Sequence, residues 1–570
     1  MPGFNISIGK YNFDFEAEQN HLKYDKLHEN HFTAIQFTLK KFEDDKLFLN
    51  QNGLFLILEG IILNKKNLQG SFETWERAVV KLYKEKGDTF FKEFRGSFSG
   101  ALFDKRKEKW IVFTDHIGTK NIYYSNIDKE LYISSEIVQL YNLFQDNKIS
   151  YSLDRQGAYM LLSYGYMLDD YTLCDKIRKL KPGCYIVFKQ GQFSVKKYHT
   201  LPKEYDESIT GGGAIEKVDH LFKQAVKLQF EKDVEYNHKH LVALSGGLDS
   251  RMASWVAHEM GYTDQLNFTF SQSDYLDETI AKEIAAALKH EWIFKALDNG
   301  LFLKELNRIN KISGGNVIYY GLAHGYSVLR YINFDNLGIL HSGQLGDVIL
   351  GSYINKLKST YTYTGQGAYS KKLINKLKKY GPIDKTSISM EQYLMQQRGF
   401  NGILTGNLPS QLYTETMSPF YDVDFISYCL KIPLKLRINH KLYKKWILKR
   451  YPKAANYIWQ KTQAKITDNR WGIPYKGYKI PFKRLPAKIL KKLGILKSGT
   501  HSSFHMNPLG YWYKNNPTIK AFQDTYFQDN IERLKGMKEI KSDCRYLYKN
   551  GSPKEKNQVL TLLAALKLFF

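Results

Sequence analysis

Cysteine is scarce in this chain, with only four residues in 570: Cys174, Cys184, Cys429 and Cys544. No two of them form a CxxC pair, and none lies near histidines at the spacing of zinc ligands. We therefore expect neither a disulfide framework nor a structural zinc site. This cysteine usage fits a protein of a reducing cytoplasm.

Long apolar runs are also missing. The first residues, MPGFNISIGK, have no apolar core of the kind found in signal peptides. The most apolar stretch, residues 559–570, is too short to cross a bilayer and is interrupted by Lys567. These absences favour a cytoplasmic location, with residues 559–570 as a buried closing helix.

Positive charge is in excess, because 83 lysines and arginines face 57 acidic residues for a formal charge of +26. Such a charge attracts polyanions, among them nucleic acid, nucleotide sugars, lipid-linked phosphates and anionic membranes. It is equally typical of a lysine-rich solvated surface. Residues 481–499 mix six basic residues with Leu and Ile. This composition favours either a helix in peripheral contact with a membrane or a solvated surface helix.

Short runs of β-branched and aromatic residues recur in the N-terminal third of the chain, at 32–39, 54–63, 110–116 and 131–136. Such runs predict strands. One helix is predicted among them at 74–87, where apolar residues recur at helical spacing and Gly87 ends the pattern. This half should therefore be built of stacked antiparallel sheets with a helix.

The pattern changes after residues 201–214, a polar segment with glycines at 211–213 that we expect to be a linker. Helices and strands then alternate, which predicts a parallel sheet with flanking helices, and the last third is mostly helical. The length fits two domains. We place them at 1–205 and 206–570.

The strongest chemical signal is the hexapeptide SGGLDS, residues 245–250, between a predicted strand and a predicted helix that begins at Arg251. Its two glycines let the backbone approach a ligand, and N–H groups of the loop and the helix start form a pocket for an anion. Asp249 would repel a bare phosphate, so we expect it to hold Mg²⁺ that bridges phosphate oxygens. The lysine of a Walker A loop is absent, which suits pyrophosphate as the leaving group.

A second turn, SGQLGD at 342–347, follows the short predicted strand 337–340. Ligands of open α/β sheets bind at this edge. Asp347 could therefore supply a second carboxylate to the metal. Alone, this segment is ordinary turn chemistry, but together with SGGLDS it predicts a nucleotide site.

The two motifs, behind a strand-rich N-terminal half, resemble those of the glutamine-dependent asparagine synthetases and their relatives. Other segments that resemble the family are FTDHIGTKNIYY (113–124), LYISSEIVQL (131–140), TLCDKIRKLKPGCYIVF (172–188), SPFYDVDFISYCLKIP (418–433) and KKWILKR (444–450). The resemblance covers nearly the whole chain. It implies an α+β N-terminal sandwich of antiparallel sheets of the Ntn-hydrolase type. An α/β pyrophosphate-loop domain, similar to the adenine nucleotide alpha hydrolases, and a helical C-terminal part would follow.

The resemblance also implies ATP and Mg²⁺ as cofactors and a role for particular residues. The pyrophosphate would be held by Ser245, Gly246, Gly247, Leu248, Asp249 and Ser250. The adenosine part would contact Ala243, Gln272, Ser342 and Gly343. Asp249 and Asp347 would hold Mg²⁺. Lys445 would lie against the phosphates, with Lys444 or Lys441 as alternatives, and Glu415 is a candidate active-site acid.

Three positions depart from the family's glutaminase pattern. Its nucleophilic cysteine follows the initiator methionine, where this chain has Pro2. Its glutamine-binding Asn-Gly is Glu59-Gly60 here, and its glutamine-anchoring aspartate falls near Trp75. We assign no glutaminase nucleophile, since Ser7 could not easily substitute. The N-terminal domain should instead be a structural or docking module.

The acceptor side departs too, because the family's SGEGxDE motif has Gln344 for its first glutamate and Val348 for its last. In the family that last carboxylate helps to bind the amino group of aspartate, and valine cannot pair with an ammonium. We therefore expect an AMP-forming amide ligase that adenylates a carboxylate other than free aspartate, such as a sugar acid of a surface polysaccharide. Ammonia or an amine would then attack. A peptide or small-molecule macrolactam cyclase is the main rival.

Two other classes stay open. A pyrophosphate-loop enzyme that modifies RNA fits the charge, but sulfur transfer needs cysteines, and none lies near SGGLDS, so nucleic acid is not an expected partner. A non-catalytic scaffold fits the altered N-terminal half, yet grouped carboxylates repel one another unless a cation joins them. The expected partners are a small-molecule, glycan or peptide carboxylate and a nitrogen donor. Oligomeric state is open, a homodimer included.

Overall fold

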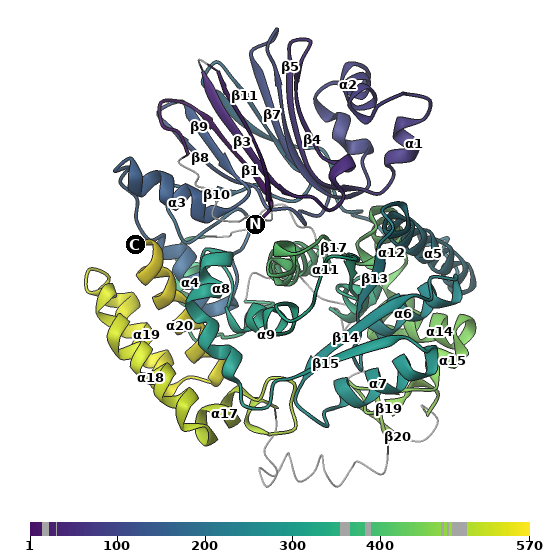
Figure 1. Cartoon of the computed structure of the whole chain (residues 1–570). Coiled ribbons are helices and arrows are strands. Elements are labelled where there is room, and N and C mark those ends of the chain that lie inside the picture. Colours follow the sequence, from purple (N-terminus) through teal and green to yellow (C-terminus); the bar gives the residue numbers. More distant parts are fainter. Residues whose placement is uncertain are drawn as a thin grey trace.

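The computed structural model describes residues 1–13, 22–29, 31–353, 365–381, 389–468, 472–475, 478–481 and 499–570. The surface helix predicted at 481–499 therefore falls, apart from its ends, outside the described residues. Two stacked sheets form the upper part of the molecule in Figure 1, above a parallel sheet and a large set of helices.

Two six-stranded antiparallel sheets make up the N-terminal half, which confirms the predicted sandwich. The first has the order β10-β8-β9-β1-β3-β2: β1 (Gly3–Ile8), β2 (Leu22–Glu29), β3 (Phe32–Leu39), β8 (Tyr123–Ile127), β9 (Glu130–Ser134) and β10 (Arg178–Lys179). The second has the order β12-β11-β7-β6-β5-β4: β4 (Leu47–Gln51), β5 (Leu54–Ile62), β6 (Gly96–Asp104), β7 (Lys109–Thr114), β11 (Cys184–Lys189) and β12 (Gln192–Lys197). Phe4, Phe55 and Val112 share the core between them.

The helix predicted at 74–87 is α2 (Trp75–Lys86), which follows the short α1 (Lys65–Gln69). The Thr74 side chain accepts from Arg77 N at its start, and Gly87 at its end has a φ of 63°. Glycine adopts such a positive φ without steric cost, so the helix stops there. Buried Trp75 and Tyr83 pack this helix onto the second sheet.

The predicted parallel sheet is confirmed, with the order β15-β14-β13-β16-β17 and parallel pairing throughout. Its strands are β13 (Lys239–Ala243), β14 (Gln265–Ser271), β15 (Glu291–Ala296), β16 (Leu337–His341) and β17 (Thr416–Met417). Helices that share its core are α5 (Gly211–Glu235), α6 (Leu248–Glu259), α7 (Leu276–Leu288), α12 (Val423–Lys431), α14 (Lys441–Arg450) and α15 (Pro452–Ala455).

The linker predicted at 201–214 is wrong at its end. Glycines 211–213 form the first turn of α5, a helix of 25 residues. Thr210 caps this helix, because its side chain accepts from Gly213 N. Ala214, Val218 and the apolar residues beyond them bury one face of α5, and this burial outweighs the low helix propensity of glycine.

The C-terminal helices pack against the N-terminal half. These helices are α17 (Leu509–Asn515), α18 (Pro517–Asn530), α19 (Lys538–Asn550) and α20 (Pro553–Phe569). One core joins them to α3 (Ile137–Asp146), α4 (Arg155–Tyr164), α8 (Leu306–Ser313) and α9 (Tyr320–Leu329), and α20 lies beside α4 and α8 in Figure 1. The closing helix is buried as predicted. No helix in the described part of the chain is long and apolar enough to span a bilayer. The boundary at residue 205 stays a proposal.

Candidate active site

The SGGLDS loop joins β13 to α6 at the carboxyl edge of the parallel sheet. The hydroxyl of Ser250 accepts from Ser245 N at 3.0 Å and lies 2.9 Å from Ser245 Oγ. Ser245 Oγ also accepts from Gly247 N at 3.2 Å. These bonds fix the loop at the N-terminus of α6, where unpaired N–H groups favour an anion.

The SGQLGD turn lies directly against this loop. A Cβ atom at Gly343 would fall 2.2 Å from Ser250 N, and one at Gly346 would fall 2.7 Å from Asp249 Cγ. Both positions therefore require glycine. Asp347 N donates to Asp249 Oδ2 at 2.9 Å, so the two aspartates that the motifs predicted to act together are neighbours in the structure.

The protein's own cation, Lys461, only partly offsets the negative charge of this acid pair. Burial and, after it, the charge of Asp347 raise the pKa of Asp249 to about 8. Lys461 Nζ lies 3.7 Å from Asp347 Oδ2, and His440 Nε2 lies 3.8 Å from it. Burial lowers the pKa of His440 to about 3, so its ring is neutral. Carboxylate oxygens are the donors that Mg²⁺ prefers, and the pair fits such an ion.

A cavity of about 550 Å³ opens beside both loops, within the size range of small-molecule sites. Its lining includes the predicted residues Ala243, Ser245, Gly247, Asp249, Ser250, Ser342 and Gly343. Gly246, Leu248, Asp347 and Gln272 are not part of the lining, although the first three lie in the same loops. Gln272 is buried, and its Nε2 has no hydrogen-bond partner among the described residues.

The candidate lysine lies on α14, and the structure separates the three alternatives. Lys445 is exposed, as is Lys441, whereas Lys444 is half-buried and burial lowers its pKa. Lys461 was not predicted; it lies in the turn between the short strands Ile458–Trp459 and Ala464–Lys465 and approaches Asp347. No motif marks Lys461, because it is distant in sequence from both loops.

Glu415 does not join this cluster. Its Oε1 accepts from Lys120 Nζ at 2.7 Å, and the two side chains are only 3% and 5% exposed. Lys120 belongs to the N-terminal half, so the pair fastens the two halves together. Glu415 is also absent from the lining of the cavity.

Two further residues shape the loop and were not predicted. Asp277 Oδ1, at the start of α7, accepts from Gly246 N at 2.9 Å. Buried Arg251 donates to the carbonyls of Ala454 and Ile458, at 3.1 and 2.6 Å, and so ties α6 to the segment that leads to Lys461. Asp277 follows β14 at the same sheet edge, and that position was a signal that could have found it.

A second group with metal-ligand chemistry comes from α5, β13 and β16. Asp233 Oδ2 accepts from His240 Nδ1 at 2.8 Å and from His341 Nε2 at 2.7 Å, and all three residues are buried. Asp233 Oδ1 accepts from Ile339 N at 2.7 Å. The carboxylate is thus already bonded on both oxygens, and the group ties α5 to the strands under the loops.

The residues at the family's glutaminase positions in the N-terminal half make hydrogen bonds and ion pairs within the protein. Buried Glu59 accepts from Gln36 Nε2 at 3.0 Å and from Thr38 Oγ1 at 3.1 Å, and Lys46 Nζ lies 3.6 Å from it. Trp75 Nε1 donates to the carbonyl of Asp45 at 3.1 Å. The Met1 amine pairs with Glu136.

Two family comparisons match the two halves. Residues 43–199 match a family described as a glutamine amidotransferase domain, and residues 217–398 match one described as asparagine synthase. The chain is also similar to a solved structure, glutamine phosphoribosylpyrophosphate amidotransferase from B. subtilis, at 8% identity and a TM-score of 0.23. That match covers 75% of this chain and 86% of the other.

Two curated relatives carry closely related names. A putative asparagine synthetase (glutamine-hydrolyzing) of Methanocaldococcus jannaschii is 24% identical over 430 residues, which cover 73% of this chain and 77% of the relative. An asparagine synthetase (glutamine-hydrolyzing) of Bacillus subtilis is 36% identical over 355 residues. That alignment covers 56% of this chain but only 46% of the relative.

Proposed function

Because the chain belongs to the asparagine synthetase family, we propose that it is an ATP-dependent, AMP-forming amide ligase. An oxygen of the acid substrate attacks the α-phosphorus of ATP, the bond from this phosphorus to the bridging oxygen breaks, and pyrophosphate leaves with the electron pair. Ammonia or an amine then attacks the acyl carbon. AMP leaves, and the nitrogen loses a proton.

The observation that carries this proposal is the contact between the two carboxylate loops at the rim of the cavity. The N–H groups of Ser245, Gly246 and Gly247 are bonded within the protein, so the donors for pyrophosphate would be the N–H groups of the first turn of α6, which no side chain caps. Lys461, beside Asp347, offsets negative charge on the leaving group. Mg²⁺ held by Asp249 and Asp347 would polarise the phosphate oxygens.

Two substitutions support an acceptor other than free aspartate and a donor other than glutamine. Val348 is buried in the apolar core and offers nothing to an ammonium. Pro2 stands where the family nucleophile would be. We infer that the acid is a different carboxylate, for example a sugar acid, and that free ammonia or an amine supplies the nitrogen.

The test is a pyrophosphate-release assay with Mg²⁺-ATP and a panel of sugar acids, peptides and amino acids. Each acid is supplied with ammonium, with glutamine or with no nitrogen source, and AMP is measured alongside. We expect acid-dependent release that ammonium or an amine supports and glutamine does not. Release from a peptide alone, with loss of water from that peptide, would instead identify a macrolactam cyclase. No release with any acid, in a protein that does not bind ATP, would contradict the proposal.

The RNA-modifying alternative gains no support. All four cysteines are buried, and burial raises the pKa of Cys174 to about 12. None of them lines the 550 Å³ cavity. A sulfur-transfer step would therefore have no thiolate near the bound nucleotide.

A further inference from the structure

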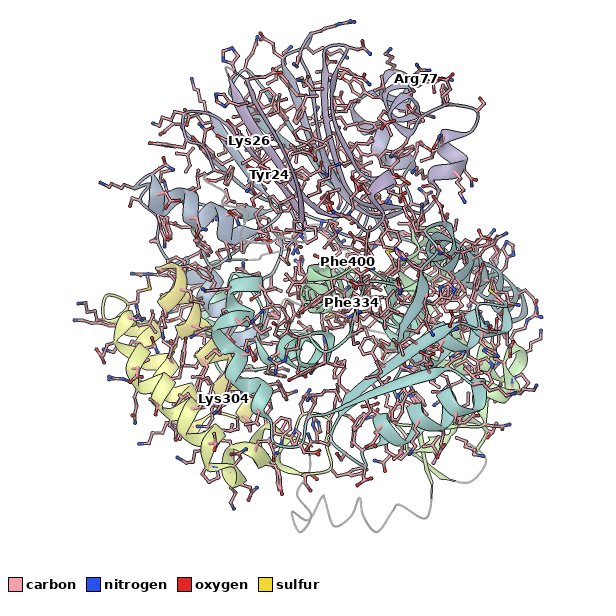
Figure 2. The ribbon with its side chains drawn as sticks, in the orientation of Figure 1. Tyr24, Lys26, Arg77, Lys304, Phe334 and Phe400 are labelled. Atoms are coloured by element: carbon pink, nitrogen blue, oxygen red, sulfur yellow. The ribbon has the colours of Figure 1, made fainter. Side chains whose placement is uncertain are left out.

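The cavity has a second side, formed by residues from outside the parallel sheet. We call Tyr166, Tyr369 and Arg398 the arginine side; all three line the cavity. Arg398 lies on the helical segment Met395–Ile403. Figure 2 labels Phe400 on this segment, near the centre of the view and below the N-terminal sheets. A Cβ at neighbouring Gly399 would lie 3.6 Å from Leu345, so this segment leans on the SGQLGD turn.

Arg398 has no carboxylate partner in the described part of the chain. Its guanidinium carbon lies 5.7 Å from the ring centroid of Tyr353, and no ion pair accompanies this contact. The two fully buried arginines differ. Arg437 binds Glu391 through two bonds of 2.7 and 3.0 Å, and Arg251 is bonded to backbone carbonyls. Arg398 is therefore a half-buried charge that the fold leaves uncompensated.

A second cation lies near one of the tyrosine rings of the arginine side. Lys554, half-buried on α20, lies 5.2 Å from the ring centroid of Tyr369. Burial, followed by repulsion from Arg398, lowers the pKa of Lys554. Like charges gathered without a counter-ion are unfavourable. Two positive groups thus lie close together at the arginine side, as two acidic groups lie close together at the loops.

Gln344, which replaces a glutamate of the family, adds a donor to the cavity. Asn407 Nδ2 donates to the hydroxyl of Tyr421 at 3.2 Å, and this hydroxyl donates to Gln344 Oε1. The Gln344 amide is thereby oriented with its NH₂ away from Tyr421. The only carboxylates of the described lining are Asp249 and Asp277, and Asp277 is bonded to Gly246 N. Apart from Asp249, which we assign to Mg²⁺, the described lining therefore offers a substrate hydrogen-bond donors and positive charge rather than a carboxylate for an ammonium.

We propose that Arg398, supported by Lys554, binds a second anionic group of the acid substrate. This inference rests on the proposed function, because it takes the cavity to be the site that binds the acid substrate. The substrate would be an acid that carries a phosphate or a further carboxylate beside the carboxylate that is adenylated. Arginine suits both groups, because its planar donors match two oxygens at once.

Inorganic phosphate is the probe for a first test. The full chain is saturated with Mg²⁺ and a non-hydrolysable ATP analogue, so that the glycine loop is filled, and phosphate is titrated against chloride at equal ionic strength. Thermal midpoints report binding. We expect saturable stabilisation of the wild type, a half-saturating concentration about tenfold higher for Arg398→Met, and a smaller increase for Lys554→Met. Arg398→Lys should keep part of the response.

The matched control is Arg308→Met, which removes an exposed arginine that lies 5.1 Å from the ring of Tyr326, outside the cavity lining. It should leave the titration unchanged. An equal response of wild type and Arg398→Met, or no response of either, would overturn the inference. Binding of the ATP analogue is measured in the same samples, so loss of nucleotide binding, which concerns the proposed function, is recognised separately.

A second test uses whichever acid supports pyrophosphate release. Arg398→Met should raise KM for that acid about tenfold and leave kcat little changed, because a contact to a remote group is made equally in ground and transition states. The Arg308→Met control should alter neither. An acid without a second anionic group, turned over with the same KM by wild type and Arg398→Met, would contradict the inference.

Discussion

The two halves of the molecule treat buried charge differently. In the N-terminal half the buried acids Asp45 and Glu59 have cationic partners: Asp45 lies near Lys65 and near Lys232 of α5, and Glu59 lies near Lys46. In the C-terminal half Arg437 is likewise paired with Glu391, but at the cavity Asp249 of the lining lies beside Asp347, and the charge of Arg398 of the lining acts on Lys554. Matched charges hold a fold together, whereas like charges left side by side indicate a ligand that completes them. We therefore propose that the N-terminal half is a scaffold, and we expect the chemistry at the cavity.

The largest effect that tests this comparison is expected from a substitution of Asp249. We expect Asp249→Asn to lower acid-dependent pyrophosphate release about a thousandfold, because one of two metal carboxylates is lost. The same change should raise the melting temperature of the metal-free protein, since it removes repulsion from Asp347. Function and stability would move in opposite directions. Pyrophosphate release and thermal unfolding without Mg²⁺ measure the two effects.

Asp529→Asn is the control for this change, because Asp529 is an exposed aspartate of α18. It should alter neither quantity. If Asp249→Asn kept full turnover, or destabilised the metal-free protein, the acid pair would be structural, and the contrast between the halves would disappear.

The matched pair Lys120–Glu415 tests the scaffold side of the comparison. Lys120→Met leaves Glu415 buried without its cation and should lower the free energy of unfolding by about 3–5 kcal/mol. The double variant Lys120→Met/Glu415→Gln should recover much of this loss, because no uncompensated charge remains. Chemical denaturation measures both.

This double variant also decides the role of Glu415. If Glu415 only joins the two halves, the folded double variant should keep its rate of pyrophosphate release. If Glu415 is a catalytic acid, that rate should fall by orders of magnitude. Large loss of turnover in a stable double variant would return Glu415 to the active site despite its place outside the cavity lining.

A smaller effect is expected from pH. The pKa of Asp249 is raised, so its contribution to the stability of the metal-free protein is fully present at low pH and is lost as the pH rises through about 8. Bound Mg²⁺ requires the ionised form. Affinity for Mg²⁺-ATP should therefore strengthen between pH 6 and pH 8, by up to about tenfold per unit, and then level off. Calorimetric titrations would show it, and Asp249→Asn should give a flatter profile.

Much of the fold and of the candidate site could be predicted from the sequence, because short segments determine those features. Strand β3 was predicted with its bounds, since an apolar run between polar turns fixes both ends. The two carboxylate loops were paired because parallel strands end at a common edge. Gly211 was misassigned because burial of the α5 face, a tertiary effect, decides that helix. Arg398, Lys461 and Lys554 could not be found, because only the packing of distant segments brings Arg398 into the cavity lining, Lys461 to Asp347 and Lys554 to Tyr369.

The smallest expected effect is none at all, and it concerns the N-terminal half. Pro2→Cys should not create glutamine hydrolysis, measured as glutamate release. The position of the family's glutamine-binding asparagine is held by Glu59, whose carboxylate is bonded to Gln36 and Thr38 and lies 3.6 Å from Lys46. The double variant Pro2→Cys/Glu59→Asn should stay inactive as well, because Trp75 stands near the place of the anchoring aspartate and is bonded to Asp45. Glutamate release above the wild-type background would mean that a glutamine site survives among these contacts, and that the N-terminal half is more than a scaffold.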